Sequence, residues 1–144
     1  MGSGALKNYN PIRITQSTRE WLSPTLVGLL NGIGTGQWKI REVPAYRQKP
    51  DFGDLDFVVE AGWFGGGPNP VQEFAQMVGP SFAPIVVRNG GVNSVGIWVG
   101  DSRVPVAGVL QVDLISSPTE RYDFTYSYLS WNDVGNLIGR ISRL

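Results

Sequence analysis

The sequence predicts an α/β (α+β) domain in which a mixed β-sheet is flanked by helices. Residues 54–60 form a β-prone run with an apolar residue at every second position. Residues 24–33 and 70–78 instead repeat apolar side chains at the three- and four-residue spacing of helices. At 144 residues, 42% of them hydrophobic, the chain is long and apolar enough for one domain spanning residues 1–144. Helices interspersed with strands favour helices packed on a sheet.

The composition excludes several kinds of chemistry. Neither Cys nor His occurs, so thiol catalysis, imidazole catalysis and zinc sites of the Cys/His type are excluded. The formal net charge is zero, so a polyanionic partner would need a local basic site. No apolar run approaches the roughly 18 residues of a membrane-spanning helix, and no signal-peptide pattern opens the sequence. We therefore expect a cytoplasmic protein with no membrane partner.

The first helix is predicted to begin after residue 23. Residues 1–17 are expected to be a poorly structured lead-in that starts with a tag remnant, since they show little periodicity. Ser23 is the predicted N-cap and Pro24 the first helical residue. The core-facing residues then follow at helical spacing, and glycines end the helix: Leu26, Leu29, Leu30 and Ile33, then Gly32, Gly34 and Gly36.

Three segments are expected around the acidic strand. Residues 38–46 alternate loosely and are predicted to form a strand, followed by a polar loop over residues 47–53. Residues 62–68 are expected to be a flexible connection. Glycines of that connection could instead cradle a phosphate, although they lack the lysine and the spacing of a P-loop.

A second helix and a mostly β region complete the prediction. Asn69 is the expected N-cap, Pro70 the first helical residue and Gly79 the residue past the end. Its buried side chains should be Val71, Phe74, Ala75 and Val78. Residues 83–88 are predicted to form a strand, followed by a turn at residues 89–91. Residues 94–99 and 106–116 are predicted to form a hairpin around residues 101–103. Aromatic residues alternate over 121–129 as in a strand, and Ser130 is the expected N-cap of a final amphipathic helix.

Two carboxylates lie two residues apart at the start of the run over residues 54–60. Asp54 and Asp56 would share one face of a strand, while Leu55, Phe57 and Val59 would share the other. Neighbouring carboxylates repel one another unless a cation lies between them. Mg²⁺ binds oxygen ligands and often uses only one or two protein carboxylates together with substrate phosphates. The pair therefore indicates a metal-binding strand end, or alternatively two solvated surface aspartates.

A third carboxylate interrupts an apolar run. Asp113 lies within residues 109–115, which are otherwise almost entirely apolar. A buried charge is costly unless it is paired or binds a metal. Asp113 could form a salt bridge with one of the twelve Lys and Arg residues. Alternatively, it lies beside Asp54 and Asp56 and completes a three-carboxylate site for two Mg²⁺ ions.

These residues resemble the nucleotidyltransferase superfamily of DNA polymerase β. The similar features are Gly53-Asp54-Leu55-Asp56 and, 57 residues after Asp56, Val112-Asp113-Leu114. The stand-alone nucleotidyltransferase-like proteins of bacteriophages and large DNA viruses are most similar, since their third motif often reads Val-Gln-Val-Asp-Leu. The resemblance covers roughly residues 23–116.

The resemblance implies a fold, a reaction and roles for individual residues. The fold would be polymerase-β-like, and the reaction would transfer a nucleotidyl group from an NTP to a hydroxyl acceptor with Mg²⁺ or Mn²⁺. Asp54 and Asp56 would bind both metals, while Asp113 would bind the second and orient the acceptor hydroxyl or take its proton. A phage-encoded protein of this family would act in the host cytoplasm, on a nucleic acid end, a protein or another acceptor.

The nucleotide site departs from the family pattern. The family has a Gly-Ser pair shortly before the first Asp, at the start of a helix, where it grips the triphosphate, but residues 43–46 read Val-Pro-Ala-Tyr. Arg47 and Lys49, together with Gly53, are the candidate nucleotide-binding residues, because the two cations could neutralise phosphate oxygens. They could equally be solvated charges on an exposed loop.

Two other functions and an oligomeric state stay open. A non-catalytic copy of the fold could serve as a binding or assembly module, which the missing Gly-Ser pair favours. A metal-dependent nuclease could use the same carboxylates with water as the nucleophile. The apolar stripe of the final helix, including Leu137, Ile141 and Leu144, would pack on its own sheet or be covered by a second subunit.

Overall fold

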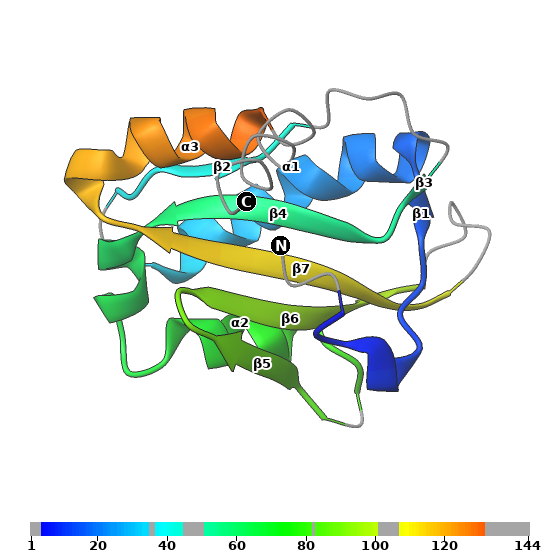
Figure 1. Cartoon of the computed structure of the whole chain (residues 1–144). Coiled ribbons are helices and arrows are strands. Elements are labelled where there is room, and N and C mark those ends of the chain that lie inside the picture. The colour runs from blue at the N-terminus through cyan, green and yellow to red at the C-terminus, as the bar shows by residue number, and fades with distance from the viewer. Residues whose placement is uncertain (1–3, 35–36, 45–50, 82, 101–106, 132–144) are drawn as a thin grey trace.

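The computed structural model describes residues 4–34, 37–44, 51–81, 83–100 and 107–131 (Figure 1). Within them, a five-stranded sheet has the strand order β2-β4-β7-β6-β5. Its strands are β2 (Ile40–Glu42), β4 (Asp54–Glu60), β5 (Ile85–Asn89), β6 (Val92–Val99) and β7 (Gly108–Ser117). The α-helices of these ranges are α1 (Gln16–Ile33), α2 (Pro70–Val78) and α3 (Tyr122–Ser130). The predicted α+β class, a mixed sheet with flanking helices, is confirmed.

The central pair of strands is parallel. β4 and β7 run side by side with Asp54 opposite Gln111 and Asp56 opposite Asp113. The other neighbours, β2 with β4, β6 with β7 and β5 with β6, are antiparallel. A parallel pair needs a long crossover, and here the chain passes through α2, β5 and β6 before it returns as β7.

Helices cover both faces of the sheet, so both faces of the central strands are buried. One face packs against α1 and α2 through Phe57, Val59, Val112 and Leu114. The other face packs against α3, where Tyr122 contacts the cluster of Val43 and Val58. Figure 1 shows α1 and α2 behind the sheet and α3 at its upper left. None of the described helices is both long and apolar enough to cross a membrane.

Helix α1 begins eight residues earlier than predicted, at Gln16 instead of Pro24. Its N-cap is Thr15, whose side chain accepts a hydrogen bond from the Thr18 backbone, and Pro24 lies inside the helix. Ser23, the predicted cap, instead donates to Glu42 of β2 at 2.9 Å. The prediction was wrong because the buried stripe starts before the proline: Thr18, Leu22, Ser23, Leu26 and Leu30. The predicted end is correct, since Gly34 is the C-cap.

The lead-in is more ordered than predicted. A 3-10 helix, η1 (Lys7–Tyr9), precedes β1 (Ile14–Thr15), which pairs with β3 (Asp51–Phe52). Residues 51–52 are therefore a short strand rather than part of a loop. The predicted strand over residues 38–46 shortens to β2, and residues 45–50 lie outside the described ranges.

The region from residue 61 to residue 99 largely follows the prediction. Helix α2 has the expected cap, since Asn69 accepts from the Gln72 backbone, and Gly79 follows its end. Strands β5 and β6 pair across the turn predicted at residues 89–91, where Gly90 has a φ of 61°. The predicted pairing of residues 94–99 with 106–116 is found as the antiparallel pair of β6 and β7. The connection over residues 62–68, expected to be flexible, begins within a 3-10 helix, η2 (Ala61–Gly65), in which Trp63 is buried and its indole N–H donates to Leu30 O.

The aromatic segment after β7 is a helix and not a strand. It starts after a 3-10 turn, η3 (Thr119–Arg121), and becomes α3. Tyr122 is buried and its hydroxyl donates to Val58 O at 2.9 Å, whereas Phe124 is 74% exposed. A spacing of four fits both a strand and a helix, so Tyr122 and Tyr126 were compatible with either. The predicted helix after Ser130 and the hairpin turn at residues 101–103 lie outside the described residues.

Candidate metal centre

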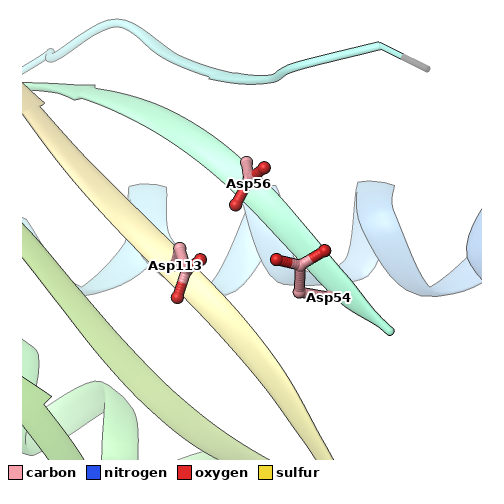
Figure 2. Close-up of side chains that lie close together, drawn as sticks. All are labelled: Asp54, Asp56 and Asp113. Atoms are coloured by element: carbon pink, nitrogen blue, oxygen red, sulfur yellow. The ribbon is translucent and has the colours of Figure 1, made fainter. Parts of the chain in front are cut away.

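The three predicted carboxylates converge on one face of the sheet. Parallel pairing puts Asp56 directly beside Asp113, and Asp54 lies one same-face position before Asp56 on β4. One carboxylate oxygen from each of the three residues lies within 4.8 Å of the other two. Figure 2 shows the three side chains rising from β4 and β7 toward the same space.

The donor set fits a hard divalent cation. Carboxylate oxygens are preferred ligands of Mg²⁺, which holds them at about 2.0–2.1 Å. Two oxygens on opposite sides of one such ion lie about 4.2 Å apart, twice that distance. Only one of the three oxygen pairs can be opposite, so oxygens that lie up to 4.8 Å apart would have to draw closer to share one ion. The three residues therefore suffice as a candidate Mg²⁺ or Mn²⁺ site.

Asp113 is fully buried and only half satisfied. Its Oδ1 accepts hydrogen bonds from the Ser94 hydroxyl at 2.6 Å and from the Gln111 amide at 3.0 Å. Its Oδ2 has no hydrogen-bond partner within the described residues, nor does Oδ1 of Asp56. Among the described Lys and Arg residues, none forms a salt bridge with Asp113, so that alternative is not supported. Buried oxygens without partners are costly, and a bound cation would offset that cost.

Asp56 is held in an unfavourable environment for its charge. Burial, as the largest cause, and the negative charges of Asp54 and Asp113 together raise the pKa of Asp56 to about 8. Desolvation and like charges both favour the protonated form. A divalent cation would offset both effects by pairing with the carboxylate. A bound cation would therefore favour the ionised form of Asp56.

The remaining predicted site residues are only partly described. Gly53 lies between β3 and β4, and the Arg13 guanidinium comes within 2.6 Å of the position that a Cβ would occupy there. Arg13 also pairs with Asp51 at 2.9 Å. Arg47 and Lys49 lie outside the described residues, so their predicted contact with phosphate stays a prediction.

Two polar residues that the prediction passed over lie against the cluster. Gln111 is on the same face as Asp113, and its position inside an apolar strand was a visible signal. Ser94 is opposite Asp113 on β6. Its proximity follows only from the register of that antiparallel pair, which the sequence does not reveal.

A cavity of about 430 Å³ lies on the opposite face of the sheet. Phe64, Pro68, Arg88, Asn93 and Ser116 are among the residues that line it. Asn93 precedes Ser94 on β6, and Ser116 lies three residues after Asp113 on β7. Because side chains alternate along a strand, Asn93 and Ser116 point away from the carboxylates. A ligand bound in this cavity would therefore be separated by the sheet from the three carboxylates.

Comparisons with known proteins add no family assignment. No protein-family model matches the chain, and no curated protein matches it.

Proposed function

We propose that this chain is a metal-dependent nucleotidyltransferase domain that transfers a nucleotidyl group from an NTP to a hydroxyl acceptor. The supporting observation is the convergence of Asp54, Asp56 and Asp113 to within 4.8 Å across a parallel strand pair. A cluster of this kind could hold divalent cations, which would stabilise the charge that develops during displacement at phosphorus.

Each carboxylate has a distinct part in the proposed reaction. Asp54 and Asp56 would hold the metals, and Asp113 would hold the second metal and orient the acceptor. The acceptor oxygen would form a bond to the α-phosphorus, and pyrophosphate would leave with the electron pair of the broken P–O bond. The acceptor proton would pass to Asp113 or to water. Bound Mg²⁺ would supply charge neutralisation on the phosphates, which is the main requirement of phosphoryl-type transfer.

The direct test is incorporation of label from α-labelled NTPs. The purified chain is incubated with each NTP, Mg²⁺ or Mn²⁺, and RNA ends, DNA ends or the protein itself as acceptor. Label should become covalently attached to one acceptor, and Asp56→Asn should abolish the attachment. Asp123→Asn is the matched control, since it makes the same change at an exposed carboxylate on α3. Cleavage of an oligonucleotide without incorporation would instead identify a nuclease.

One observation favours a second candidate, a non-catalytic binding or assembly module of the same fold. Val43 is buried and its N–H bonds the Asp56 carbonyl at 2.8 Å, so the chain continues β2 alongside β4 there. A helix start with a Gly-Ser pair, which grips the triphosphate in the polymerase β family, has no counterpart at residues 43–44. Mn²⁺ binding without incorporation or cleavage, for every NTP and acceptor, would support this candidate.

A further inference from the structure

The hydrogen bonds around Asp113 are unequally shared between its two oxygens. Both donors, the hydroxyl of Ser94 and the side-chain amide of Gln111, reach Oδ1. All three side chains are at most 1% exposed, so water does not compete for these bonds. Oδ2 lacks a partner within the described residues. Figure 2 shows one oxygen of Asp113 turned toward the two carboxylates of β4.

The amide of Gln111 is itself held in one orientation. Its Oε1 accepts from the Leu6 backbone N–H at 3.4 Å, while its Nε2 donates to Asp113. Rotating the amide by half a turn would direct its oxygen at a carboxylate and its NH₂ group at an N–H, so both contacts would become repulsive. Leu6 is fully buried against Ile85 and Val109, so this contact is anchored in a small hydrophobic cluster.

We propose that Ser94 and Gln111 are positioning residues that hold the Asp113 carboxylate with Oδ2 directed at the metal. This inference rests on the metal site of the proposed function. A carboxylate can rotate about its last side-chain bond, and two donors on one oxygen stop that rotation. They also occupy Oδ1, so Oδ2 is the oxygen left for a cation. Groups that hydrogen-bond to a metal ligand on the side away from the metal fix the orientation of that ligand and tune the affinity of the site for metal.

A purely structural role for the two residues predicts something different. If Ser94 and Gln111 only satisfy a buried carboxylate, their removal lowers the stability of the metal-free protein and leaves the affinity of the folded protein for metal unchanged. If they position Asp113, the affinity falls as well. Affinity for Mn²⁺ and stability in EDTA must therefore be measured on the same variants.

The test compares Ser94→Ala, Ser94→Thr and Gln111→Met with the unaltered chain. Mn²⁺ affinity is measured by electron paramagnetic resonance, which reports free Mn²⁺ and needs no substrate. Ser94→Ala and Gln111→Met should each bind Mn²⁺ about 10–100-fold more weakly, as for other residues that bond a metal ligand. Ser94→Thr keeps the hydroxyl and should recover most of the affinity. Ser117→Ala is the matched control, because Ser117 is an equally buried serine whose hydroxyl bonds Thr125 and not the cluster.

Each outcome has a separate meaning. If the unaltered chain does not bind Mn²⁺, the metal site is wrong and the positioning role is wrong with it. If the unaltered chain binds Mn²⁺ and the folded variants bind it equally well, only the positioning role is wrong. Should Ser94→Ala fail to fold, Gln111→Met decides on its own, since it keeps the volume of the side chain and removes only its hydrogen bonds.

Discussion

At the scale of single residues, the protonation state of Asp56 has the largest consequences. Three carboxylates in one small space would repel one another if all were ionised, and burial adds to the cost of ionising Asp56. The metal-free protein reduces that cost by keeping Asp56 protonated up to a pH of about 8. Because Asp56 keeps its proton in the folded state, the stability of the metal-free protein depends on pH.

In EDTA, the free energy of unfolding should fall as the pH rises from about 4 to about 8. Asp56 keeps its proton in the folded state over this window because its pKa is raised to about 8, while the unfolded chain loses it near pH 4. The contribution of Asp56 is at most about 1.4 kcal/mol per pH unit. Urea denaturation from pH 5 to pH 8.5 measures it as the difference in slope between the unaltered chain and Asp56→Asn.

The Asp56→Asn variant should therefore be more stable than the unaltered chain in EDTA at pH 8. It removes a charge that nothing compensates in the metal-free state. Asp123→Asn is the control, since it makes the same change at an exposed carboxylate outside the cluster. Parallel pH profiles for the unaltered chain and Asp56→Asn would show that Asp56 titrates normally.

The sequence predicted the three carboxylates of the site better than the residues that hydrogen-bond to them. Asp54, Asp56 and Asp113 stand out because carboxylates interrupt β-prone runs, and such interruptions are visible without a structure. Gln111 shares a strand and a face with Asp113, so its place was predictable although its role was not. Ser94 reaches Asp113 only through the register of β6 on β7, which depends on the whole sheet.

At the scale of elements, local signals were correct where tertiary packing agreed with them. The Asn69 cap, Pro70 start and Gly79 end of α2 all hold. Ser23-Pro24 offers an equally good local start signal, yet α1 runs through it. The residues before the proline pack on the sheet, and the paired side chains of Arg19 and Glu42 at 2.9 Å join α1 to β2. Packing over the whole helix outweighs one lost backbone hydrogen bond.

Replacing Pro24 with Ala should stabilise the protein by about 1–2 kcal/mol. Inside a helix, Pro costs about 3 kcal/mol relative to Ala, and the greater freedom of the unfolded chain with Ala offsets up to about 1 kcal/mol. Pro24 is exposed, so no core contact is lost. Chemical denaturation measures the change. A neutral or destabilising effect would indicate a helix that begins at Pro24, where Pro is favourable.

Helix α3 gives a matched pair of substitutions. Tyr122→Phe removes the hydroxyl that donates to the Val58 carbonyl and should cost about 1–2 kcal/mol of stability. Tyr128→Phe makes the same change on an exposed side chain and should alter stability by less than about 0.5 kcal/mol. In a strand, Tyr122 and Tyr128 would share a face, so equal effects of the two substitutions in denaturation experiments would contradict the helix.

At the scale of the whole molecule, the order of strands in the sheet determines which residues lie next to one another. β4 and β7 are separated by a crossover that includes a helix and a hairpin, and their parallel pairing joins the carboxylates of the two strands. The sequence predicted the class of fold and the members of the cluster. The strand order and the distance between carboxylates depend on contacts distant in the sequence, so no local pattern could supply them.

The central claim is that the three carboxylates bind a divalent cation, and thermal melting with and without Mn²⁺ tests it most directly. A ligand at one hundred times its dissociation constant stabilises the folded state by about 2.7 kcal/mol, which raises Tm by several degrees. The unaltered chain and Asp123→Asn should both show this rise relative to EDTA, and Asp56→Asn should not. If the unaltered chain melts at the same temperature in EDTA and in millimolar Mn²⁺, the cluster is not a metal site.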